Sequence, residues 1–211
     1  TTNSTLMLMN EKEEKATEPN MYQSAKLLQL SAVRTVLSVV ENLPQFALPY
    51  LSQLLSPSAL PSRALRRGGD ELSEDDLHVA RMAERLDGAL AAGIPARQLI
   101  PAASRAVADC LKFPDGAVET RAVLGIVKAS VTKSTRAELS PVVGKVLNAA
   151  IRVFDHHDHF DDESSDDGRR RLDLLSASNE TLLALVMKLS ESQLRPLYAR
   201  LREWRGELAG E

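Results

Sequence analysis

Four segments of the chain place apolar residues at the three- and four-residue spacing of an amphipathic helix. They are residues 25–43, 73–93, 118–131 and 180–189. The first carries its stripe on Leu30, Val33, Leu37 and Val40, and the second on Val79, Met82, Ala83, Leu86 and Leu90. The third is apolar nearly all round, which is typical of a helix covered on several sides. We therefore expect four helices, the third of them in the middle of a stack.

Residues typical of helix ends stand at both ends of the segment 73–93 and directly after the segment 180–189. Ser73, with Asp76 three residues later, has the form of a capping box, and Gly93 follows the last apolar residue of the same segment. Ser190, with Gln193 three residues later, has the same form. The sequence thus predicts helix starts after Ser73 and after Ser190.

A second pattern recurs around four prolines. The stretches are "PYLSQLL" from Pro49, "PAASRAV" from Pro101, "PVVGKVL" from Pro141 and "PLYARLR" from Pro196. In each, two apolar residues follow the proline, then a small residue, a long polar one and an apolar one. Proline suits the first turn of a helix, because the first backbone N–H groups have no intrahelical partner to lose. We therefore expect a helix to begin near each proline, with Pro196 in the first two turns of the last one.

Together the two patterns predict a fold. The prolines stand 52, 40 and 55 residues apart, close to the period of HEAT and armadillo repeats. Each proline helix has an amphipathic helix upstream, and no segment shows the sustained alternation of a strand. The prediction is an all-α solenoid of about four HEAT-like antiparallel helix pairs in residues 21–207. Residues 1–20 are expected to be poorly ordered, and the connector 56–71 and the acidic His/Asp-rich loop 155–171 to join helices.

The overall composition limits the classes of partner. The formal net charge is −3 and aromatic residues make up 4%, so the chain lacks the positive charge and stacking residues typical of nucleic-acid binding, although a local basic face stays open. The single cysteine, Cys110, excludes an internal disulfide framework and lies in a helical period, as a core residue would. No apolar stretch approaches the roughly 18 residues of a membrane helix, so no membrane contact is expected. The start at Thr1 suggests a piece of a longer protein.

The segment "DHHDHFDDE", residues 155–163, holds residue types that bind zinc. Neighbouring histidines in one loop cannot all face one ion, however, and His78 is the only other histidine. We therefore expect a solvated acidic loop and no metal, with a metal-dependent hydrolase around His156 to Asp162 as an alternative. No nucleophile with a matching base and no phosphate-binding loop stands out, so neither catalytic residues, nor a cofactor, nor a small-molecule substrate is expected.

The basic residues near the C-terminus form the candidate interaction surface. Arg195, Arg202 and Arg205 fall three to seven residues apart on the last predicted helix, away from its apolar stripe. Arg169, Arg170 and Arg171 form a second basic run. A solvated helix face accounts for such arginines, and contact with an acidic protein or an RNA backbone is the functional alternative.

Three phrases carry a resemblance to a known family. They are "ENLPQFALPYLSQLL", "GIPARQLIPAASRAV" and "LVMKLSESQLRPLYARLREW". In this order they resemble the C-terminal region of the large HEAT-repeat scaffold subunits of the small-subunit processome, which are associated with a small nucleolar RNA in eukaryotic ribosome biogenesis. The likeness covers about residues 23–205. The loop 155–171 and residues 1–20 depart from it.

The resemblance implies a nucleolar scaffold without catalytic activity. Its expected partners are other processome proteins, including WD-repeat subunits, and pre-ribosomal RNA or a small nucleolar ribonucleoprotein, with direct RNA contact left open. A HEAT-type adaptor of another pathway, such as nuclear transport or phosphatase scaffolding, is the alternative, because a fold does not determine a function.

Overall fold

The computed structural model describes residues 24–56, 73–113, 116–156 and 165–209, and every regular element in these ranges is helical. The first helix spans residues 24–42. The elements that follow are η1 (Pro44–Tyr50), α2 (Leu51–Leu54), α4 (Glu74–Gly93), α5 (Ala96–Cys110), α6 (Ala117–Lys133), α7 (Arg136–Leu139), η3 (Ser140–Val142), α8 (Val143–His156), α9 (Ser165–Val186) and α10 (Glu191–Ala209). None of the helices in these ranges is both long enough and apolar enough to span a membrane.

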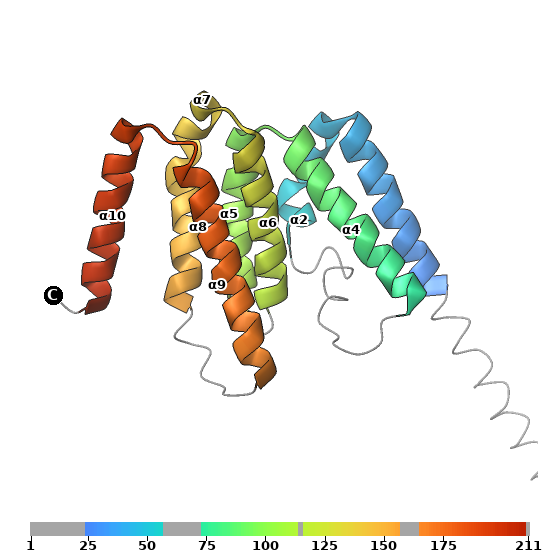
Figure 1. Cartoon of the computed structure of the whole chain (residues 1–211). Coiled ribbons are helices and arrows are strands. Elements are labelled where there is room, and N and C mark those ends of the chain that lie inside the picture. The colour runs from blue at the N-terminus through green and yellow to red at the C-terminus, as the bar shows by residue number, and fades with distance from the viewer. Residues whose placement is uncertain (1–23, 57–72, 114–115, 157–164, 210–211) are drawn as a thin grey trace, which may run out of the picture.

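The helices form two layers of a solenoid (Figure 1). In the first layer α4 contacts α6 and α6 contacts α9, and in the second α2 contacts α5 and α5 contacts α8. Short connections at the same end of the molecule join α4 to α5 and α9 to α10, so the members of each pair run antiparallel (Figure 1). The all-α solenoid predicted from the sequence is confirmed.

Helix α6 lies at the centre of the stack, as its apolar pattern predicts. It contacts α4, α5 and α9. Val123, Leu124, Val127 and Val131 are completely buried on it. Because α6 is covered on three sides, it supplies core residues to both layers, which a helix with one apolar stripe could not do. Cys110, at the end of α5, is also completely buried, and this agrees with its interpretation as a core residue.

Polar side chains in the interior connect the helices to one another. The Ser178 hydroxyl on α9 donates a hydrogen bond to the Ala150 carbonyl of α8, at 3.2 Å. The Thr181 hydroxyl lies 3.4 Å from the Leu124 carbonyl of α6 and 2.8 Å from that of Ala177. Buried hydroxyls need such partners, because an unpaired one costs about 1–3 kcal/mol. These contacts fix how α9 sits against both neighbours.

The positions of the prolines differ from the prediction. Helix α5 begins at Ala96 with Pro95 as its N-cap, so Pro101 is the sixth residue of the helix and not its start. Pro196 is likewise the sixth residue of α10, within the first two turns as expected. Pro49 and Pro141 lie in the 3-10 segments that lead directly into α2 and α8. The 3-10 turn accommodates proline because its backbone is already tightened before the α-helix begins.

The extent of the loop 155–171 was predicted wrongly. Asp155 and His156 belong to the last turn of α8, and α9 already begins at Ser165. The first turns of α9 contain only polar residues and a glycine, so no apolar period indicated a helix there. Residues 157–164 lie outside the described residues, as do 1–20 and all of the connector 56–71 except Ser56.

Both predicted capping positions are helix starts. The backbone N–H of Asp76 donates to Ser73 Oγ, at 3.3 Å, and Ser73 is the N-cap of α4. The Asp76 carboxylate in turn accepts from Ser73 Oγ, at 2.6 Å, and from Lys26 Nζ, at 2.9 Å. The hydrogen bond from Ser73, followed by that from Lys26, lowers the pKa of Asp76. At α10, the Ser190 backbone N–H donates to Gln193 Oε1, at 3.1 Å.

We predict that Asp76→Asn lowers the free energy of unfolding by about 1–2 kcal/mol at pH 7, because a charge-assisted hydrogen bond between the first helix and α4 is lost. A carboxyl whose pKa is lowered by folding stabilises the fold above its ordinary pKa of 3.8 and loses this contribution as the pH falls through the lowered value. Urea unfolding at pH 7 and pH 3 should therefore show a difference between wild type and variant that shrinks at pH 3. A difference that is equal at both pH values would contradict the assignment.

We predict that Pro196→Ala raises the free energy of unfolding by about 1–3 kcal/mol, because alanine restores a backbone N–H in a helix interior. The Pro196 side chain is exposed, so little packing is lost. Pro141→Ala is the matched control, since Pro141 is also exposed but lies in a 3-10 turn. It should give no such gain in urea unfolding, and equal gains for both variants would refute the explanation.

Candidate interaction surfaces

The arginines predicted on the last helix all lie on the surface of α10. Arg195, Arg202 and Arg205 are exposed, while Leu197 on the same helix is buried. Arg195 Nη2 makes an ion pair with Glu191 Oε1, at 2.9 Å. No ion pair within the described residues involves Arg202 or Arg205. Exposed helix-surface pairs contribute only about 0.3–0.5 kcal/mol, so these arginines do little for folding.

Trp204 determines how α10 is oriented. Its ring lies 5.7 Å from that of Phe154 on α8, centroid to centroid, at an angle of 42°. Its Nε1–H donates to Asp155 Oδ1, at 2.6 Å. A tryptophan held at both its ring and its N–H resists rotation of the helix that carries it. Trp204 therefore packs α10 against α8.

The other three predicted arginines lie on a different helix. Arg169, Arg170 and Arg171 occupy the first two turns of α9. Arg169 is exposed, and Arg170 and Arg171 are half-buried and already engaged in interactions within the chain. The six arginines thus belong to two basic regions. Whether either region binds a partner stays a prediction.

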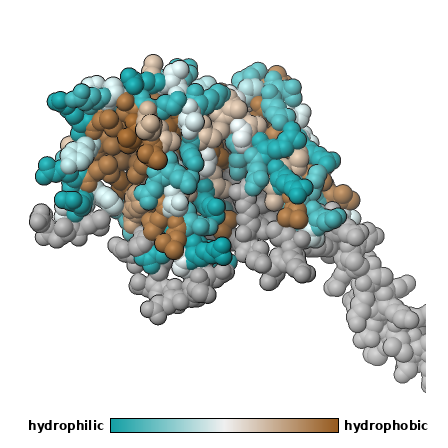
Figure 2. All heavy atoms as spheres, viewed as in Figure 1, coloured by the Kyte–Doolittle hydropathy of each residue, from teal (hydrophilic) through white to brown (hydrophobic). Residues whose placement is uncertain are grey.

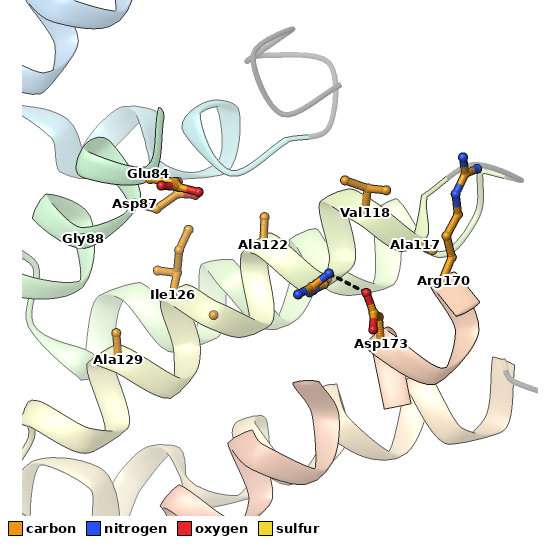
Figure 3. A pocket seen from close by; sticks show the side chains of 12 residues that line it. Glu84, Asp87, Gly88, Ala117, Val118, Ala122, Ile126, Ala129, Arg170 and Asp173 are labelled. Carbon is orange, nitrogen blue, oxygen red and sulfur yellow. Dashed lines mark hydrogen bonds and ion pairs between the residues drawn. The ribbon is translucent and has the colours of Figure 1, made fainter. Parts of the chain in front are cut away.

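A groove that the sequence did not indicate crosses the first layer (Figure 3). Its floor is α6, its walls come from α4 and α9, and its volume is about 530 Å³. Small residues on α6 form the floor: Ala117, Ala122, Gly125 and Ala129. Glu84 and Asp87 lie on the α4 wall, and Arg170 and Asp173 on the α9 wall. The groove therefore has an acidic side and a side of mixed charge.

Two ion pairs connect α6 to α9 at the edge of this groove. Arg121 Nη1 lies 2.7 Å from Asp173 Oδ2 (Figure 3), and Lys128 Nζ lies 2.7 Å from Glu180 Oε2. The hydrogen bond and charge of Lys128 lower the pKa of Glu180. Both partners are seven residues apart on their helices, so the pairs stand two turns apart along one seam. The order of the pairs along the seam shows that α9 runs parallel to the floor helix.

Two glycines in this groove have no internal packing role. Gly88 lies within α4 and Gly125 within α6, and a Cβ added to either would meet no heavy atom within 4 Å. Glycine inside a helix costs about 0.5–1 kcal/mol relative to alanine. The only sign of the groove in the sequence is the spacing of the small residues Ala122, Gly125 and Ala129. This spacing does not stand out, because the segment is apolar nearly all round.

The structure describes only the first two residues of the His/Asp-rich segment 155–163. His156 ends α8, and a nitrogen of its ring is hydrogen-bonded to the Leu111 carbonyl. His157, His159 and the neighbouring aspartates lie outside the described residues. Within the part of the chain that the structure describes, no three His, Cys, Asp or Glu side chains are placed to hold a metal ion.

The comparisons with known proteins gave one match. The family model of the BP28CT (NUC211) domain matches residues 138–211, which run from the end of α7 through η3, α8, α9 and α10. This is a C-terminal domain of nucleolar ribosome-biogenesis proteins. No curated protein and no solved structure matches the chain. The match supports the ribosome-biogenesis part of the expectation and leaves the particular complex open.

We predict that Gly125→Ala raises the free energy of unfolding by about 0.5–1 kcal/mol, because the new methyl group enters open space and alanine favours the helix. Gly116→Ala is the control, since its Cβ would fall 1.8 Å from the Cys110 carbonyl oxygen. That variant should lower the free energy of unfolding. Thermal and urea unfolding of both variants measure the effect, and a loss of stability in Gly125→Ala would contradict it.

Proposed function

We propose that this chain is a non-catalytic scaffold of the small-subunit processome that supports nucleolar processing of pre-ribosomal RNA and assembly of the small ribosomal subunit. The observation that carries the proposal is the match of the BP28CT domain to residues 138–211. The resemblance of the three quoted phrases adds the particular complex, since they follow the order found in its HEAT-repeat subunits.

The architecture supports a role in holding partners. A two-layer solenoid exposes a long surface for its length, and adjacent repeats can contact different parts of a large assembly. The groove between α4 and α9 is open along the first layer and has charges on both walls. An open groove of this kind suits an extended protein segment better than it suits a small molecule, which usually binds in an enclosed pocket.

The proposed partners are other processome proteins, including WD-repeat subunits. Pre-ribosomal RNA or the small nucleolar ribonucleoprotein is the second class, through the arginines at the start of α9. An RNA contact made only by arginines and phosphates would weaken steeply with salt. The proposed location is the nucleolus, where these partners assemble.

Affinity purification from eukaryotic cells that express the tagged chain tests the proposal. We expect processome proteins and unprocessed pre-ribosomal RNA to copurify and the tagged chain to accumulate in the nucleolus. Depletion of the endogenous protein should raise the level of unprocessed pre-ribosomal RNA and lower that of small subunits. Copurification of nuclear-transport or phosphatase subunits in place of processome proteins would favour the alternative adaptor and overturn the proposal.

A further inference from the structure

Helix α9 carries apolar residues on two sides. Leu174 and Leu185 are buried against the stack. Leu172 and Leu183 lie on the opposite side and are 68% and 61% exposed. Met187, just after the end of the helix, is 77% exposed, and its backbone N–H donates to the Leu183 carbonyl. Single exposed apolar residues such as Leu172 need no explanation, because exposed Ser176 and Asn179 separate it from the others, but Leu183 and Met187 stand one turn apart and form a patch. Met187 follows Glu180 by seven residues, so the exposed apolar residues border the edge of α9 that is ion-paired with α6.

Helix α10 extends the patch into a continuous apolar surface. Tyr198 is 65% exposed, and Leu194 and Leu201 are only partly buried. On α9, Leu182 and Val186 are also partly buried. Figure 2 shows apolar side chains gathered over the region between α9 and α10. We call the surface formed by Leu182, Leu183, Val186, Met187, Leu194, Tyr198 and Leu201 the end face.

The rest of the stack shows what such a surface accepts. Helix α6 packs against α4 and α5, and α9 packs against α6 and α8. Each of these first-layer helices therefore contacts both layers of the preceding part of the stack. The end face offers the same combination, a first-layer helix beside a second-layer helix. No helix in the described ranges occupies it. Its shape and apolar character thus match the apolar side of one further helix.

The charges beside the end face select among such helices. Helical spacing puts Arg202 and Arg205 on the same flank of α10 as Tyr198. Arg200 and Glu203 lie on the other flank, where they line a surface with residues of α8. Within the stack, α9 brings Asp173 and Glu180, seven residues apart, to Arg121 and Lys128 of α6. Arg195 is already paired with Glu191, whereas Arg202 and Arg205 stand three residues apart on α10, so carboxylates one turn apart on a docking helix would meet both of them.

A second copy of this chain fits the end face less well. The first helix has the exposed leucines Leu27 and Leu28, but exposed Arg34 lies seven residues after Leu27 and therefore on the same side of that helix. A copy docked through that helix would bring Arg34 towards the arginines of α10. RNA also fits poorly, because leucine and methionine at the centre of the surface offer no stacking partner for bases.

We propose that the end face binds an amphipathic helix of a partner protein, which packs its apolar stripe on Leu183, Met187 and Tyr198 and presents carboxylates to Arg202 and Arg205. The proposal rests on the scaffold function above and names the kind of partner segment that one end of the scaffold takes. Apolar packing supplies the affinity, and the arginines select an acidic helix over a basic one.

The test uses two synthetic helical peptides of about 20 residues with the same leucine stripe, one flanked by glutamates and one by lysines. Binding of each to the full chain is followed by fluorescence anisotropy. We expect the glutamate peptide to bind at least about tenfold more tightly than the lysine peptide, with the difference reduced at high salt. Equal binding of both peptides, or binding of neither, would overturn the proposal.

Variants locate the binding to the end face. Leu183→Asp with Met187→Asp should abolish binding, and Arg202→Glu with Arg205→Glu should reverse the preference in favour of the lysine peptide. Leu28→Asp and Arg97→Glu are the matched controls, because both residues are exposed on other helices, and they should change nothing. Circular dichroism confirms that each variant is folded, which the exposure of all six side chains makes the expected result. Binding that survives the end-face variants would refute the assignment.

Two further measurements compare the rival occupants. Sedimentation of the full chain over a range of concentrations tests for a second copy, and we expect no self-association that depends on the end face. A single-stranded RNA oligonucleotide tests for RNA, and we expect it not to compete with the glutamate peptide. Either effect would overturn the proposal in favour of a second copy or RNA. The peptide measurements do not depend on the processome, so a failure there is distinguishable from a failure of the proposed function, which the purification from cells reports.

Discussion

The packing of one helix against both layers of the stack is the constraint on which the structure depends. Helix α6 contacts α4, α5 and α9, and its core residues Val123, Leu124 and Val127 are completely buried. A single pair of helices cannot cover its own apolar faces, so each pair is stable only against its neighbours. The stability of this fold is therefore a sum of contacts between adjacent pairs, and within the described residues the faces at the two ends of the stack have a neighbouring pair on one side only.

This constraint also explains where the polar contacts lie. In the interior, Ser178 and Thr181 connect α9 to the backbones of α8 and α6. At the surface, the Arg136 guanidinium at the start of α7 donates to the Lys188 carbonyl, at 2.9 Å, and satisfies a group just after the end of α9. These bonds give α9 one position and one orientation. A helix held so firmly on one side can leave apolar side chains exposed on the other without losing its place.

The sequence predicted the helices wherever apolar spacing was present. Val33, Leu37 and Val40 are buried as a stripe on the first helix, and Leu86 and Leu90 on α4. The first turns of α9 could not be found this way, because arginines, aspartates and a glycine carry no apolar period, and contacts with other helices decide their structure. The start of α5 was misplaced because Pro101 matched a repeated phrase. The residue that caps α5 is Pro95, which lies two residues after Gly93 at the end of α4. Proline is compatible with both positions, so residue type alone could not decide.

The groove and the end face could not be predicted from the sequence either, because both depend on contacts between helices. The groove places Asp87 of α4 and Asp173 of α9 on either side of the floor helix α6, and no local pattern encodes a pair of residues so far apart in the chain. The end face was hidden because Leu183 and Leu185 look equivalent in a leucine-rich segment, although one is exposed and the other is completely buried. Only the stack distinguishes them, by covering one side of α9 and leaving the other open. Both surfaces thus arise from packing between pairs, and residues on them can change without disturbing the contacts that hold the pairs together. A solenoid can in this way keep its fold while its open faces are adapted to particular partners.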